Sequence, residues 1–161
     1  MFKNNREINF KQPLRETETF LYFSSKILME FNLNRFIEAQ EHSYNIALNE
    51  IRNGRKESHW IWYIFPQEKG LGHSYNSRFY GLDGLDEAIA YWAHPILNAR
   101  LREISEALLT HTGKDIHLIM GSRIDTVKLK SCMKLFNRVA PNDIFQKILD
   151  TFYPKRKEVT K

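Results

Sequence analysis

The segment from His59 to Gln67 is the part of the chain richest in side chains that could hold a ligand. It carries Trp60, Trp62 and Tyr63 beside the histidine, and a buried tryptophan needs an acceptor for its indole N–H. Two interpretations stay open. Either the rings form the centre of the core, or one indole lines a pocket and stacks on a base, a sugar or a nicotinamide-like ring. His59 reads as a hydrogen-bonded structural histidine, because no carboxylate close in sequence orients it as a general base.

The turn Gly70-Leu71-Gly72-His73-Ser74 comes next and leads into Arg78. Glycines before a serine-capped helix expose backbone N–H groups at the positive end of that helix, where phosphate or carboxylate binds readily. Arg78 could add a bidentate contact. The turn has neither the Gly-Lys-Ser/Thr of a phosphate-binding loop nor a dinucleotide fingerprint. The alternative is a plain connector with a serine cap.

Residues 124–139 form a predicted amphipathic helix. One arc carries the basic side chains of Arg123, Lys130, Lys134 and Arg138, and the apolar face lies opposite. Asp125 and Lys128 project with the apolar side, where polar groups need partners. They could border a ligand cleft. Otherwise Asp125 caps the helix and Lys128 extends along the surface.

His94-Pro95 ends one helix and starts the next, which carries Arg100. His94 either caps a helix end or belongs to a site. The remaining histidines lack the spacings of metal ligands, so we predict no metal and no cofactor. No nucleophile elbow or paired-carboxylate motif is present.

The composition of the 161-residue chain is that of one ordinary globular domain. Its net charge of +5 is confined to residues 1–16 and 155–161, and 17–154 is neutral. Nucleic-acid binding is therefore not favoured. A single cysteine, Cys132, excludes an intrachain disulfide, and no apolar run reaches a membrane span. We expect a cytoplasmic monomer with no membrane partner.

Helical periodicity and caps predict an all-α, compact multihelical single domain. Residues 58–65 are ambiguous: aromatic and β-branched content favours a strand, whereas Ser58 as cap and Pro66 as terminator favour a short buried helix. Phe20, Phe23, Ile27 and Phe31 mark an N-terminal helix expected to dock on the body. The other expected helices are 34–52, a short one after Ser74, 85–93 capped by Asp83, 95–110, 116–120 capped by Asp115, 124–139 and 142–152.

The chain resembles a bacterial family known only as a domain of unknown function. The motifs that carry the resemblance are Asn34-Arg35-Phe36, Ala39-Gln40, Gly54-Arg55-Lys56, His59-Trp60-Ile61-Trp62, Ile64-Phe65-Pro66-Gln67, Gly70-Leu71-Gly72, Arg78-Phe79-Tyr80, His94-Pro95, Leu101-Arg102, Asp125, Lys128-Leu129, Ser131 and Leu135-Phe136. The resemblance covers about 33–153 and implies a multihelical fold, with 58–65 helical. It brings no established activity. Cys132 stands where that family is expected to have a small residue, which weakens the case for a catalytic thiol.

These features predict a flexible segment 1–16, an added helix 17–32, a family-like domain 33–153 and a basic tail 154–161. Two functions remain. One is binding or processing of a small phosphate-bearing or nucleotide-like metabolite, which makes an anionic small molecule the expected partner. The other is a helical protein-interaction module without catalysis. The candidate site residues are His59, Trp62, Gln67, Gly70, Gly72, Ser74, Arg78, His94, Arg100, Asp125 and Lys128. We expect any site where the 66–80 turn meets the 124–139 helix.

Overall fold

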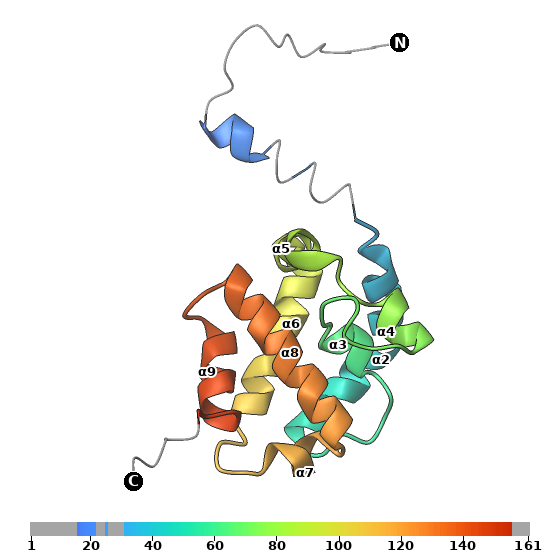
Figure 1. The fold of residues 1–161 in the computed structure, drawn as a ribbon, viewed down its shortest axis with the longest axis vertical. Helices are drawn as coiled ribbons and strands as arrows, with labels where there is room; N and C mark the ends of the chain where they lie inside the picture. The colour runs from blue at the N-terminus through green and yellow to red at the C-terminus, as the bar shows by residue number, and fades with distance from the viewer. Residues whose placement is uncertain (1–15, 22–24, 26–30, 156–161) are drawn as a thin grey trace, which may run out of the picture.

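The computed structural model describes residues 16–21, 25 and 31–155, and these residues fold as an all-α domain (Figure 1). In 31–155 the helices are α2 (Asn34–Arg52), α3 (Ile61–Ile64), α4 (Tyr75–Phe79), α5 (Gly84–Ala93), α6 (Pro95–Leu109), α7 (Ile116–Met120), α8 (Arg123–Val139) and α9 (Ile144–Phe152). The β-structure of this described part is one isolated bridge between Glu68 and Leu82. The predicted all-α fold is confirmed.

Helix α8 runs through the middle of the bundle and packs against α5, α7, α9 and α3 (Figure 1). Its inward face buries Leu129, Cys132 and Phe136, as the periodicity predicts. Helix α2 packs against α6 and α3 on another side. Because α3 touches both α2 and α8, the aromatic segment before Pro66 lies between the two longest helices.

Several helices start at a residue whose side chain caps them, but Asp83, expected to cap 85–93, makes no capping side-chain hydrogen bond and α5 begins at Gly84. Ser74 and Asp115 accept from the first-turn N–H groups of α4 and α7, as predicted. Helix α9 starts at Ile144 rather than 142, because Asn142 is left-handed (φ 59°) and Asp143 is the cap. Asp125 does not cap α8. Ser122 does, accepting from the N–H of Asp125 at 3.1 Å.

The 58–65 segment contains a single helical turn, α3, and not a helix that begins at Ser58. The carboxylate of Glu50 on α2 explains the difference. It accepts from the backbone N–H groups of Glu57 and Ser58, from the Ser58 hydroxyl, and from the indole N–H of Trp60 at 2.7 Å. These bonds hold 57–60 in a bent, non-helical path, so that the helix begins only after Trp60.

The expected N-terminal helix lies only partly within the described residues. Residues 16–21 and 25 are helical. The side chain of Phe20 is 73% exposed, so it does not dock on the body as expected. Phe23 and Ile27 lie outside the described residues. Phe31 is partly buried and packs against the core.

No helix in the described part of the chain has the length and apolar character needed to cross a membrane.

Candidate functional site

A polar hollow of about 400 Å³ lies where the segment before α3 meets Ser74, the end of α7 and the start of α8. This volume falls within the range of small-molecule sites. Its lining residues are Lys56, Glu57, His59, Ile61, Trp62, Ser74, Met120, Gly121, Ser122, Ile124, Asp125 and Lys128. Three predicted segments therefore converge on one place: the aromatic block, the turn before α4, and the inward side of α8.

One wall of the hollow is a buried ion pair between Lys56 and Asp125. The Lys56 Nζ lies 2.8 Å from the Asp125 carboxylate, and only 6% of the lysine side chain is exposed. The same Nζ donates to the Ser58 carbonyl at 2.6 Å and lies 4.8 Å from the Trp60 ring centroid. The opposite charges of Lys56 and Asp125 cancel, so the main effect of the ion pair is to hold the loop before α3 against the first turn of α8.

Lys128 and Trp62 form the other wall, and their polar groups are not matched within the protein. The Lys128 Nζ lies 4.8 Å from the centroid of the Trp62 ring. Among the described residues no carboxylate comes within 4.0 Å of it. The indole Nε1–H of Trp62 is buried and donates to no acceptor in that part of the chain. The ammonium of Lys128 is partly exposed and open to solvent, whereas the buried N–H of Trp62 lacks a partner within the described part of the chain.

A much smaller cavity of about 10 Å³ lies behind Trp62 and Lys128, among Gln67, Asn76 and Ser77. It has room for about one water molecule and not for a metabolite. The turn above it is closely packed, since a Cβ added at Gly72 would lie 2.7 Å from the Cβ of Ser77. Glycine at position 72 therefore allows the turn to close over α4.

The structure brings some of the predicted site residues together. His59, Trp62, Ser74, Asp125 and Lys128 line the polar hollow, and Gln67 joins Lys128 in the small cavity. Gly70 is exposed with φ of 95°, and Gly72 shapes the turn. Arg78 is exposed on α4 and lines neither space.

His94 and Arg100 lie in another part of the fold, around α6. The Nδ1 of His94 accepts from the N–H groups of Ile96 and Leu97, so this histidine caps α6. Arg100 donates to the Oε1 of Gln40 at 3.3 Å and lies over the Tyr44 ring. It connects α6 to α2, away from the hollow.

The lining residues that the sequence did not indicate are Lys56, Glu57, Ile61, Met120, Gly121, Ser122 and Ile124. Lys56 follows a turn glycine and gave no sign that it would be buried, since its partner is 69 residues away in the sequence. Ile124 did carry a signal. Together with Val127 it is apolar but falls outside the buried face of α8, and exposed apolar pairs of this kind can mark binding surfaces.

The thiol of Cys132 and the possible metal ligands of the described residues are not arranged as a catalytic or metal site. Cys132 is fully buried, and burial raises the pKa of its thiol well above the usual value, which suppresses thiolate formation. The described residues contain no cluster of three histidine, cysteine or carboxylate side chains that could hold a metal ion.

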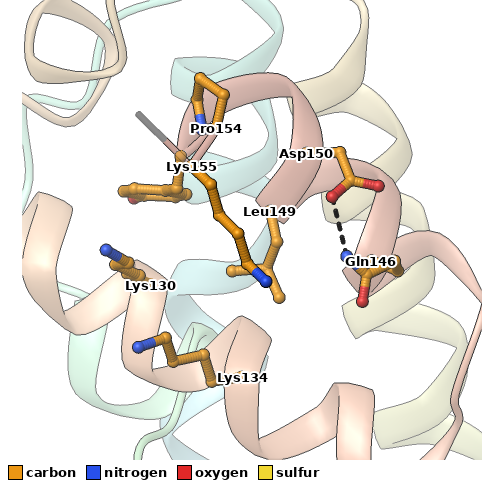
Figure 2. Close-up of a pocket in the computed structure, with 8 residues that line it drawn as sticks. Lys130, Lys134, Gln146, Leu149, Asp150, Pro154 and Lys155 are labelled. Atoms are coloured by element: carbon orange, nitrogen blue, oxygen red, sulfur yellow. Dashed lines mark hydrogen bonds between the residues drawn. The ribbon is translucent and has the colours of Figure 1, made fainter. Parts of the chain in front are cut away.

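A larger hollow of about 880 Å³ lies between α8 and the end of α9 (Figure 2). Figure 2 shows Lys130 and Lys134 side by side on α8, Lys155 crossing the space, and Asp150 accepting from Gln146 on the far side. Lys130 lies over the ring of Tyr153, whose hydroxyl donates to the Thr126 carbonyl. This basic groove takes in two residues of the predicted stripe and none of the predicted site residues.

Comparison with known proteins places the chain among uncharacterised proteins. Residues 30–161 match DUF1810, described as a protein of unknown function. The chain belongs to this family. The resemblance to an uncharacterised helical family is confirmed, and the DUF1810 match begins at residue 30 rather than 33, so that Phe31 falls within it.

A solved structure also resembles this DUF1810 protein. The conserved hypothetical protein Rv1873 from Mycobacterium tuberculosis, a crystal structure at 1.38 Å, is 40% identical and superposes with a TM-score of 0.74. The similarity covers 77% of this chain and 89% of that one. No curated protein matches the chain significantly.

Proposed function

We propose that this DUF1810 protein binds a small phosphate-bearing or nucleotide-like anion in the polar hollow. The observation that carries the proposal is the position of Lys128 over Trp62: among the described residues no carboxylate lies within 4.0 Å of the cation, and the buried indole N–H has no acceptor. An anionic oxygen in the hollow would accept from Lys128, and from the Trp62 N–H once the ring shifts to expose it. Charge-assisted hydrogen bonds of this kind are stronger than neutral ones.

The rest of the hollow supports an anion. Ser122 lines it and caps the 17-residue helix α8, whose N-terminal end carries a partial positive charge. His59 adds an exposed imidazole, whereas the Ser74 hydroxyl is already used, since it donates to Ser77 Oγ at 2.9 Å and accepts from the Ser77 N–H. Lys56 and Asp125 neutralise each other, and the exposed carboxylate of Glu57 lies 3.7 Å from the Arg55 guanidinium, so Lys128 supplies the positive charge that is free to attract a ligand.

Binding is better supported than catalysis. In the described structure the imidazole of His59 has no carboxylate hydrogen-bonded to it that would orient it as a base, and Cys132 lies in the core rather than in the hollow. A nucleophile paired with a base is therefore not part of this site.

The proposal is tested by a thermal-shift screen of the full chain against nucleotides, dinucleotides and sugar phosphates. A ligand that prefers the native state raises the melting temperature by mass action. The indole N–H resonance of Trp62, assigned by comparison with Trp62→Phe, should move when a hit is added. If stabilising ligands are found but this resonance stays in place, the site lies elsewhere.

The interaction-module alternative has one observation in its favour. Tyr75 and Phe79 on α4 are stacked with ring centroids 5.7 Å apart, yet they are 69% and 42% exposed. Exposed aromatic pairs are typical of protein-binding surfaces. A photocrosslinking residue at position 75 in cells should then capture one discrete partner, and the same residue at exposed His42 on α2 should not.

A further inference from the structure

A second hollow of about 360 Å³ adjoins the polar one along α8. Its lining residues are Gln67, Leu71, Arg123, Ile124, Val127, Lys128 and Ser131. Lys128 and Ile124 line both hollows, so their side chains form the wall between the two. The two hollows therefore lie next to each other along α8, and a ligand that passes over this wall would reach both.

The second hollow differs in character from the first. Three aliphatic side chains line it, and all are largely exposed: Leu71 at 59%, Ile124 at 68% and Val127 at 62%. They come from two separate elements, the turn before α4 and the outer side of α8. Aliphatic groups that face a shared space while remaining in water gain free energy when an apolar ligand group fills it.

The charged groups in this second hollow are all cationic. Arg123 and Lys128 line it, and no carboxylate does. Neither has an acidic side chain within 4.0 Å in the described part of the chain. An aromatic ring between them would gain cation–π attraction as well as apolar contact, whereas a saturated ring would gain the apolar contact alone.

We propose that this apolar hollow holds an aromatic ring attached to the anion bound in the polar hollow, so that the ligand class is an aryl or nucleoside phosphate. This inference rests on the proposed function and deepens it. The polar hollow supplies charge and hydrogen bonds, and the apolar hollow supplies selection for the ring. Lys128, on the shared wall, contacts both parts of the ligand.

Three probes separate the contributions: inorganic phosphate, cyclohexyl phosphate and phenyl phosphate, each titrated into the full chain by following the Trp62 indole resonance. We expect phenyl phosphate to bind about tenfold more tightly than inorganic phosphate, with cyclohexyl phosphate between them. Val127→Asn should remove most of the gain of phenyl phosphate and leave inorganic phosphate unchanged. Its matched control is Leu118→Asn, since Leu118 is 73% exposed on α7 and lines neither hollow.

The outcomes distinguish this inference from the proposed function. Equal affinities for phosphate and phenyl phosphate, or a gain that survives Val127→Asn, would overturn the ring site while the anion site stands. Cyclohexyl phosphate binding as tightly as phenyl phosphate would overturn the assignment of an aromatic ring. If none of the three probes moves the Trp62 resonance, the anion site itself fails and the inference fails with it.

Discussion

Glu50 is the residue that organises the segment before the site. Burial would raise the pKa of its carboxyl, but hydrogen bonds from Ser58, Glu57 and Trp60 outweigh burial and lower the pKa below the ordinary 4.5. A carboxyl whose pKa is lower in the folded state binds fewer protons there than when unfolded. Its contribution to stability is therefore present above about pH 4.5 and is lost as the pH falls through the lowered value.

Glu50→Gln tests this directly. A glutamine has one acceptor oxygen in place of two charged ones, so it cannot satisfy the same set of donors. We expect a loss of about 1–3 kcal/mol in the free energy of unfolding near pH 7. The loss should shrink as the pH is lowered towards 3, measured by urea denaturation. Glu41→Gln, at an exposed position of the same helix, is the control. It should change neither the free energy of unfolding nor its dependence on pH.

Lys128 is the residue on which ligand affinity should depend most. Lys128→Ala should weaken binding of an anionic ligand by about 1.5–3 kcal/mol, the range for hydrogen bonds to charged groups, and leave the fold intact. Lys134→Ala on the same helix is the matched control, because it faces the basic groove of Figure 2. Arg78→Ala should also be silent, because Arg78 lies outside both hollows. Equal losses from Lys128 and Lys134 would indicate unspecific charge attraction.

At the scale of elements, the Lys56–Asp125 pair joins the loop before α3 to α8 along one wall of the site. Asp125→Ala leaves a buried ammonium without its carboxylate, and we expect a loss of about 3 kcal/mol in the free energy of unfolding. Replacing both partners, as Lys56→Met with Asp125→Leu, should recover much of that loss. Calorimetric melting of the two variants decides this. If the double variant is no more stable than Asp125→Ala, the loss does not come from the unpaired ammonium alone, and the contacts of the ion pair itself stabilise the fold.

The helices were predictable because their signals are local. Ser74, Asp115 and Pro95 mark helix starts within a few residues of the sequence, and the apolar period of α8 places its buried face. Residues 58–65 were harder, because the non-helical path before α3 depends on the Glu50 carboxylate of the preceding helix, α2. The site residues show the same division between local signals, which can be predicted, and long-range partners, which cannot. Periodicity placed Lys128 correctly, but no local pattern could show that Asp125 pairs with Lys56.

At the scale of the whole molecule, the N-terminal segment sets a testable boundary. Removing 1–16 should leave the melting temperature unchanged. Removing 1–32 should lower it, since the cut deletes Phe31 from the core and Asn32, whose carbonyl accepts from Arg35 at 2.6 Å. Full burial of an aromatic side chain contributes about 1.5–3 kcal/mol, so the partly buried Phe31 should contribute less than this. Two truncations that both melt like the full chain would show that the domain begins after Phe31.

Because the single cysteine is buried, the rate at which its thiol is labelled reports how often the folded domain opens. Cys132 has no exposed surface, so a water-soluble disulfide reagent can reach its sulfur only when the helices around α8 separate. The rate of labelling should therefore report the population of globally opened chains, rising in Glu50→Gln and falling when a ligand binds the native state. Rapid labelling of the native full chain would mean that α8 opens locally while the rest of the domain stays folded.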